Sequence, residues 1–177
     1  RLMPVKVIST DWDFVFDSPN VGTDSVIAQG IRYAVDNGAR VLNMSIGRSG
    51  SGLAPAVESA LRYAVSRGAF VAISAGNDFE EGNPVEVFAD LAGQIDGVMA
   101  VAAVNRDLNR APYSGVKPYV EIAAPGGDVR VGGTSGLVIQ QSYDPNRALI
   151  DVLSRPLSQF GPPRFDDFAI STEYPAG

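Results

Sequence analysis

Apolar positions recur at helical spacing in two segments of the chain whose sequences match each other. Residues 31–41 read IRYAVDNGARV and residues 61–71 read LRYAVSRGAFV, so the second segment starts 30 positions after the first. That interval is about the length of one strand–helix–strand unit. Each segment predicts the end of a helix, a glycine that stops it, and a strand that follows. We therefore expect two consecutive helix–strand units here.

Both predicted helices carry local signals at their ends. Thr23 or Asp24 can cap the first helix, and Pro55 suits the first turn of the second. Gly38 and Gly68 suit the left-handed residue that ends a helix. On each helix four apolar side chains fall on one face: Ile27, Ile31, Ala34 and Val35 on the first, and Val57, Leu61, Ala64 and Val65 on the second.

The predicted strands are apolar runs that alternate along the chain with these helices. Val41–Ser45 and Phe70–Ser74 are mostly apolar rather than alternating, which is typical of strands covered on both faces. Further runs lie at Val98–Val104 and Tyr119–Ala124, and at Val5–Ser9 near the start. Strands that alternate with helices favour an α/β fold with a mainly parallel sheet and helices on both faces.

The last part of the chain has a different pattern. Residues 132–136 read GGTSG, which predicts a flexible turn, and residues 137–143 suit a short strand. After them Pro, Asp, Arg and Phe mix without a clear period. We expect a single domain over residues 1–177, with an α/β core over 1–130 and an irregular excursion over 131–177.

Composition argues against several kinds of protein. Hydrophobic residues make up 45% and charged residues 19%, as in an ordinary globular domain. No apolar run approaches the roughly 20 residues that span a bilayer, and the net charge of −6 comes without a basic cluster. We therefore expect no membrane and no nucleic-acid partner. The chain has no cysteine and no histidine, which removes disulfides, thiolate chemistry and any Ser-His or Cys-His pair made within it.

Small and polar residues follow two of the predicted strands. Residues 43–47 read NMSIG and residues 74–77 read SAGN. In open parallel sheets, ligands bind at the carboxyl ends of the strands. Two interpretations stay open at this point: loops that use Gly and Asn for turns, or the walls of a binding site.

These two motifs resemble the NMSLG and AAGN elements of the subtilisin-like serine proteases, the subtilases. Together with four further segments in the family's order and with suitable spacing, they carry the resemblance over residues 1–145. It implies an incomplete subtilisin-like fold and a parent protein that is a serine endopeptidase. The other matching segments are LMPVKV at 2–7, VMAVAAV at 98–104, YSG at 113–115 and VEIAAPGG at 120–127.

The resemblance also implies what this chain lacks. The subtilase triad runs Asp, His, Ser along the chain, and the first two motifs precede the segment that matches residues 2–7. The serine motif, GTSMA, would begin where this chain ends, at Gly177. Ser135 and Asp11 imitate triad residues but lack the family's flanking sequence, so we reject both. We expect the isolated chain, a central fragment between the His and Ser motifs, to be inactive.

The resemblance assigns roles to the two polar strand ends. Asn77 matches the family's oxyanion-hole asparagine, which donates its side-chain amide to the developing oxyanion. Small residues on either side would leave an open slot that suits a medium or large apolar side chain. The plainer alternatives are a turn asparagine and tight packing at strand ends. The walls of the substrate pocket would be Ser45, Ile46 and Gly47 on one side and Ser74, Ala75 and Gly76 on the other.

No cofactor is required for the implied chemistry, although subtilases often bind structural calcium. Neither acidic cluster of this chain has the regular ligand spacing of a calcium loop, and a solvated surface is the favoured interpretation. The two clusters are Asp11, Asp13 and Asp17, and Asp78, Glu80 and Glu81.

The resemblance implies peptide or protein substrates and a parent protein that is secreted or otherwise extracytoplasmic. The family's Asp strand lies in mid-sheet and its Ser helix in the core, so a chain without them should leave apolar surface uncovered and self-associate. Another class stays open, a non-catalytic peptide-binding module that keeps the groove. A dinucleotide-binding domain is disfavoured, because Gly47, Gly50 and Gly52 have the wrong order for that fingerprint.

Overall fold

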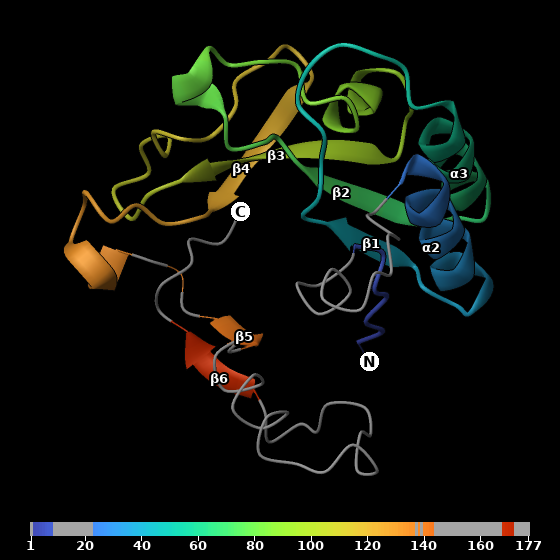
Figure 1. The fold of residues 1–177 in the computed structure, drawn as a ribbon, viewed down its shortest axis with the longest axis horizontal. Coiled ribbons are helices and arrows are strands. Elements are labelled where there is room, and N and C mark those ends of the chain that lie inside the picture. Colours follow the sequence, from blue (N-terminus) through green and yellow to red (C-terminus); the bar gives the residue numbers. More distant parts are fainter. Residues whose placement is uncertain (1, 9–22, 137, 139, 144–167, 172–177) are drawn as a thin grey trace, which may run out of the picture. The chain divides into compact units, whose positions relative to one another are not determined.

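The structure is a computed structural model that describes residues 2–8, 23–136, 138, 140–143 and 168–171 (Figure 1). The acidic cluster of Asp11, Asp13 and Asp17 lies outside these ranges, as does Gly177. The chain divides into two compact units. The first contains the described residues up to Ala103 together with Pro112–Ala124, and the second contains Val104–Ala111 and the described residues from Pro125 onward.

Two α-helices form where the apolar spacing predicts them, α2 over Asp24–Asp36 and α3 over Pro55–Ser66. They pack against each other and lie side by side in Figure 1. Thr23 is the N-cap of α2, and its hydroxyl accepts the Val26 N–H at 3.4 Å. Pro55 occupies the first turn of α3, where its missing N–H has no helical partner to lose.

Both helices end in the same hydrogen-bonded motif. After α2, the Gly38 N–H donates to the Val35 carbonyl at 3.0 Å, and the Ala39 N–H donates to the Ala34 carbonyl at 2.9 Å. After α3, the N–H groups of Gly68 and the residue following it donate to the equivalent two carbonyls. Gly38 and Gly68 have φ values of +92° and +79°, the left-handed conformation that this motif requires.

The first unit is built on a sheet with strand order β1-β2-β3-β4. The pairs β1–β2 and β2–β3 are parallel, so the expected α/β fold with a mainly parallel sheet is confirmed. The strands are β1 over Val41–Met44, β2 over Phe70–Ser74, β3 over Val98–Val104 and β4 over Val120–Pro125.

Burial alternates along β1 and β2, which the apolar sequence does not predict. Leu42 and Met44 are buried while Val41 and Asn43 are exposed. The register pairs Leu42 with Val71 and Met44 with Ile73, so the buried side chains of both strands share one face. The apolar faces of α2 and α3 cover this face and form the core. Helices on the second face remain a prediction.

The strand expected at Val5–Ser9 is wrong for its described part, residues 5–8, which forms no sheet ladder. Instead, Val5 and Val7 pack against the core through their side chains. Val7 lies directly over Gly30 of α2, where an added Cβ would overlap its side chain. The segment therefore satisfies its apolar pattern by packing on a helix.

Several short elements were not expected. In the first unit these are two 3₁₀ turns, η1 over Phe79–Glu81 and η2 over Ala89–Gly93. In the second unit, η3 covers Gly133–Gly136, and β5 over Gln140–Tyr143 agrees with the predicted short strand. The prediction of irregular structure after residue 143 is wrong for β6, Phe168–Ser171, which pairs antiparallel with β5. A pairing so distant along the chain leaves no local signal.

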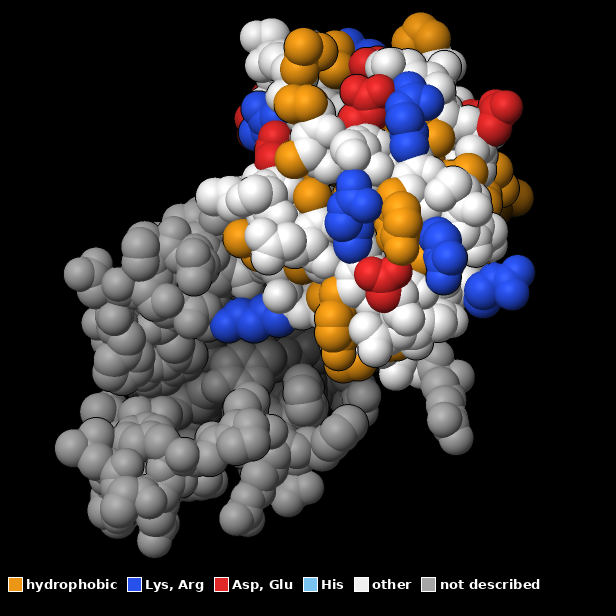
Figure 2. Space-filling view, turned by 90° about the vertical axis from the view of Figure 1, so that its right-hand side faces the viewer, with side chains coloured by type: hydrophobic (Ala, Val, Ile, Leu, Met, Phe, Trp, Pro, Cys, Tyr) orange, Lys and Arg blue, Asp and Glu red, His pale blue; other side chains and the backbone are white. Residues whose placement is uncertain are grey.

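Charges of both signs are interspersed with apolar side chains on the face of the molecule seen in Figure 2, which gives no basic stripe there. One ion pair on the surface of α3 joins Arg62 to Glu58 at 2.9 Å, a spacing of one helical turn. Within the described ranges, neither α-helix has the length and apolar content that a membrane span requires.

Candidate functional site

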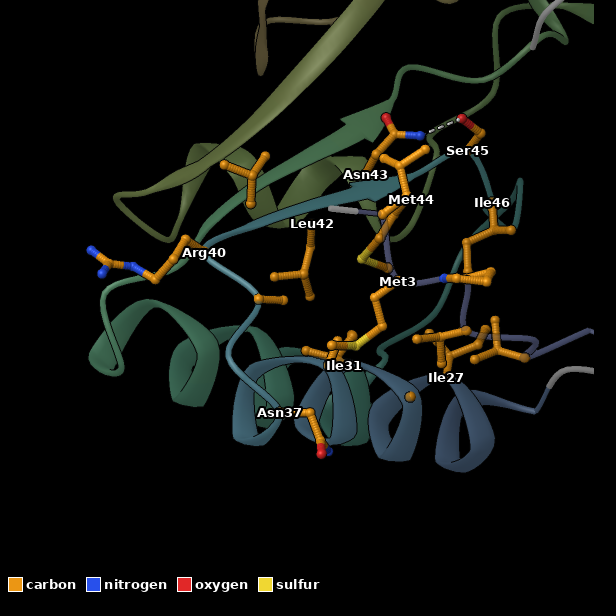
Figure 3. A pocket seen from close by; sticks show the side chains of 18 of the residues that line it. Met3, Ile27, Ile31, Asn37, Arg40, Leu42, Asn43, Met44, Ser45 and Ile46 are labelled. Carbon is orange, nitrogen blue, oxygen red and sulfur yellow. Dashed lines mark hydrogen bonds between the residues drawn. The ribbon is translucent and has the colours of Figure 1, made fainter. Parts of the chain in front are cut away.

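The two polar motifs leave the sheet side by side. β1 and β2 are parallel neighbours whose register pairs Met44 with Ile73, so the segments that follow them emerge at the same carboxyl edge. Ser45 and Ile46 continue from β1, and the Asn43 side-chain amide donates to the Ser45 hydroxyl at 3.3 Å (Figure 3). The structure thus brings together the two walls that the sequence proposes.

The wall after β2 is held by close backbone contacts. The Ala75 N–H donates to the Val101 carbonyl at 2.9 Å, and the Gly76 carbonyl accepts the Gly115 N–H at 3.0 Å. An added Cβ on Gly115 would overlap the Ala75 carbonyl oxygen, so only glycine allows this approach. Ser74, the last residue of β2, is half-buried beside them. Gly115 of the YSG motif therefore packs against this wall and holds it through a backbone hydrogen bond.

Asn77 follows at the end of this wall with its side chain exposed. The preceding Gly76 has φ +88°, a left-handed turn that redirects the chain immediately after β2. Among the described residues, no group forms a hydrogen bond with the Asn77 amide. Its two N–H donors thus have no partner within the described part of the chain.

Glu86 is the site residue that sequence reasoning missed. A short antiparallel contact joins residues 48–50 to residues 85–87. In it, the Gly50 N–H donates to the Val85 carbonyl at 2.9 Å and the Val87 N–H donates to the Arg48 carbonyl at 3.0 Å. This contact places Glu86 beside the wall that follows β1.

The Glu86 carboxylate lies between the two walls. An added Cβ on Gly47 would overlap it, and one on Gly76 would lie 3.3 Å from its Oε2. Oε1 accepts the Arg48 backbone N–H, and Oε2 accepts the Ser49 hydroxyl at 3.2 Å. The side chain is 4% exposed. The slot between the glycines thus contains a buried carboxylate, which differs from the open apolar slot expected from sequence.

The surroundings of this carboxylate disfavour its charge. Burial raises the pKa of the Glu86 carboxyl above its ordinary value of 4.5. The Arg48 N–H and the Ser49 hydroxyl oppose this shift, whereas the charge of Asp78, which also accepts the Ser49 hydroxyl, adds to it. The Arg48 guanidinium pairs with Asp24 at 3.1 Å instead. Within the described part of the chain, no cation pairs with Glu86.

The Glu86 backbone is anchored from the opposite side. Its N–H donates to the Tyr119 hydroxyl at 2.9 Å, and burial raises the pKa of that phenol. Glu86 is the one charged residue in the otherwise apolar run VEVFA, and such a run indicates burial. Because glutamate is almost never fully buried unless its charge is paired, this pattern was the sequence signal that could have found Glu86. Its place between Gly47 and Gly76 depends on a contact 38 residues away, which the sequence does not reveal.

Asp78, Glu80 and Glu81 are not arranged as a set of metal ligands in the described part of the chain. Asp78 accepts the Ser49 hydroxyl, and the three residues lie at the start of and within η1. Across the described ranges, no group of acidic side chains is arranged to hold a metal ion.

A separate apolar groove lies beside β1. It has a volume of about 1100 Å³ and runs between residues 2–7, α2 and β1. Met3, Ile27 and Ile31 point toward one another within it, while Ser45 and Ile46 line one end (Figure 3). Gly47, Gly76 and Glu86 do not line this groove, although one end of the groove adjoins the wall that follows β1.

Comparison with known proteins shows which family the chain belongs to. The model of the subtilase family matches residues 3–154. Subtilisin DY of Bacillus licheniformis is 37% identical over 112 residues, which cover 63% of this chain and 39% of that protein. Thermitase of Thermoactinomyces vulgaris is 33% identical over 114 residues, covering 63% of this chain and 37% of its own length.

Solved structures show the same fold. A protease from Pseudoalteromonas arctica PAMC 21717 has a TM-score of 0.58 at 33% identity, over 71% of this chain and 38% of that one. A lanthipeptide protease has a TM-score of 0.62 over 98% of this chain and 51% of its own, but its 20% identity supports the fold alone. The chain thus spans less than two thirds of each of these relatives. On the family match and these similarities, it belongs to the subtilase family of serine proteases.

Proposed function

We propose that the complete protein is a serine endopeptidase that cleaves peptide bonds through an acyl-serine intermediate. In this proposal the present chain contributes the oxyanion donor Asn77 and the two walls of the primary substrate pocket. The observation that carries it is the exposed amide of Asn77 at the sheet edge, to which no other described residue forms a hydrogen bond, next to two glycine-containing walls.

The proposed chemistry needs a neutral donor at a fixed position. When a serine attacks the substrate carbonyl, negative charge develops on the carbonyl oxygen, and a preorganised N–H stabilises it. Asn77 follows a left-handed glycine whose carbonyl is held by Gly115, so its position is set by backbone contacts. The amide does not ionise in the accessible pH range, which suits a donor that must neither gain nor lose a proton during the reaction.

The serine and its base would come from outside this chain. With no histidine in 177 residues, the chain cannot assemble a Ser-His pair by itself. The proposed chemistry needs no cofactor, and its substrates are peptides or proteins. We further propose that the complete protein acts outside the cytoplasm, an inference that rests on family resemblance.

A hydrolysis assay tests this proposal. The complete protein should cleave a general fluorogenic protease substrate, and a serine-directed phosphonate should abolish cleavage. The 177-residue chain should show no cleavage above background. If the complete protein cleaves nothing, or if the phosphonate has no effect on its activity, the proposal is wrong.

The second candidate function is a non-catalytic peptide-binding module. The complete lack of histidine favours it, because the walls can hold an extended peptide without any catalytic base. Under this function the peptide would bind and be recovered intact. Mass spectrometry of the peptide after incubation with the complete protein distinguishes the two candidates.

A further inference from the structure

We propose that Glu86 makes the pocket select peptides with lysine or arginine immediately before the cleaved bond. This inference rests on the proposed function, since it names the substrate class of the same site. It replaces the expectation of an apolar preference, which assumed an empty slot between the walls.

The Glu86 carboxylate occupies the space between the two walls. Neither Gly47 nor Gly76 has a side chain, and Glu86 lies in the space that their side chains would occupy. A substrate side chain that enters between the two walls therefore approaches the carboxylate. Because the walls are glycine at these two points, neither Gly47 nor Gly76 places a side chain between the substrate and the carboxylate.

The Glu86 carboxylate has acceptor capacity left for a substrate side chain. An ionised carboxylate offers about four acceptor positions, and the Arg48 N–H, the Ser49 hydroxyl and the Phe88 N–H all donate to Glu86. The remaining capacity suits a donor of an ammonium or of a guanidinium. An apolar side chain would leave it without a partner.

The charge of the Glu86 carboxylate favours a cationic substrate side chain. Glu86 is almost fully buried, Asp78 lies one hydroxyl group away, and no cation among the described residues pairs with Glu86. A buried carboxylate without a counterion is costly, and an apolar ligand that excludes more water increases that cost. A cationic side chain removes it, whereas an acidic one meets two negative charges.

A purely structural role for Glu86 explains these contacts less well. The contact between residues 48–50 and 85–87 already has two backbone hydrogen bonds, from Gly50 to Val85 and from Val87 to Arg48. A glutamine at position 86 could accept the Arg48 N–H with its amide oxygen and donate its amide N–H to the Ser49 hydroxyl oxygen, while that hydroxyl donates to Asp78. Glu86→Gln therefore keeps a structural role and removes only the charge.

The test uses the complete protein and a set of peptides that differ only at the residue before the cleaved bond. That residue is arginine, lysine, norleucine, glutamine or glutamate, and norleucine is the uncharged match for lysine. We expect kcat/KM for the cationic peptides to exceed that for norleucine by roughly 30-fold or more, the scale of a buried charge pair. Glu86→Gln should reduce this ratio to within a few-fold.

Glu121→Gln is the matched control, because Glu121 is an exposed residue of β4 and belongs to neither wall. It should leave the ratio unchanged. An equal or higher rate for norleucine in the unaltered protein overturns the inference, as does a ratio that survives Glu86→Gln. These results leave the proposed peptidase function intact.

Failure of the proposed function gives a different result. If no peptide is cleaved at all, that function is wrong, and selectivity is then read from the Kd of the same peptides by calorimetry. Tighter binding of the arginine and lysine peptides, lost in Glu86→Gln, still supports the role of Glu86. Equal binding of all five peptides overturns it.

Discussion

The proposed oxyanion donor, Asn77, predicts a specific kinetic effect when it is replaced. In the complete protein, Asn77→Ala should lower kcat by about 10²–10³-fold with little change in KM, because the donor acts on charge that develops only in the transition state. This magnitude is the known cost of losing the equivalent asparagine in a subtilisin, a member of the same family. Steady-state kinetics on a fluorogenic peptide measure it.

Asn37→Ala is the control for this change, because Asn37 is an exposed asparagine at the C-cap of α2, away from the two walls. Its rate should match that of the unaltered protein. A full rate in Asn77→Ala would show that Asn77 is only a turn residue.

The Glu86 carboxyl also predicts a dependence of stability on pH. Because its pKa is raised on folding, the folded chain keeps the proton at pH values where the unfolded chain has released it. Its stabilising contribution is therefore complete below about pH 4.5 and is lost as the pH rises through the raised pKa. The groups that face it are Asp78, the Ser49 hydroxyl and the backbone N–H groups of Arg48 and Phe88.

Glu86→Gln should remove this part of the pH dependence. Urea unfolding between about pH 4 and pH 8 should show a smaller loss of unfolding free energy with rising pH in the variant. Glu121→Gln, which removes an exposed carboxylate, should follow the unaltered chain. Parallel curves for Glu86→Gln and the unaltered chain would contradict a raised pKa at this site.

At the scale of elements, the two helix ends depend on left-handed glycines. Gly68 has φ +79°, and the nearest atom to an added Cβ is Arg40 Nη2 at 3.9 Å, so space is not limiting there. Gly68→Ala should therefore destabilise the chain through backbone strain alone, by about 1–2 kcal/mol. Urea unfolding measures the difference in unfolding free energy.

Gly93→Ala provides the comparison, because Gly93 lies in η2 without a positive φ and an added Cβ would make an ordinary contact with Tyr119 at 3.4 Å. Its change should stay within about 0.5 kcal/mol. If both alanines cost the same, the backbone conformation at Gly68 is not the cause.

The elements that sequence could predict are those with strong local signals. The helices, their Thr23 and Pro55 starts and their glycine ends follow from spacing and from the backbone demands of each residue type. The parallel sheet follows from the alternation of helices and strands. These features need no knowledge of distant contacts.

The elements that sequence could not predict depend on distant partners. β6 exists because it pairs with β5, and residues 5–8 pack on α2 although their apolar pattern suits a strand. At the candidate site the positions of the two walls were predictable from strand ends. The carboxylate of Glu86 between them was not, because a chain reversal brings it there.

At the scale of the whole molecule, the exposed edge of the sheet predicts self-association. Among the described residues no strand pairs with the outer edge of β1, Val41 is 67% exposed, and an apolar groove lies alongside. Exposed strand edges pair readily with a second copy. We expect the isolated chain to form dimers or larger species, measured by light scattering after gel filtration.

A charge on this edge should weaken the association. Val41→Lys should raise the dissociation constant by at least about tenfold, which corresponds to roughly 1.4 kcal/mol. Leu53→Lys is the matched control, because Leu53 is 87% exposed but lies outside the strands. A chain that is monomeric at all concentrations contradicts this prediction.

Covalent trapping shows whether this chain is part of an acyl-transferring serine peptidase. The complete protein is treated with a peptidyl phosphonate that carries arginine next to its phosphorus, and the modified residue is located by mass spectrometry. We expect one adduct per molecule, on a serine outside these 177 residues. An adduct on a serine within this chain, or none while the peptide still binds, would contradict it.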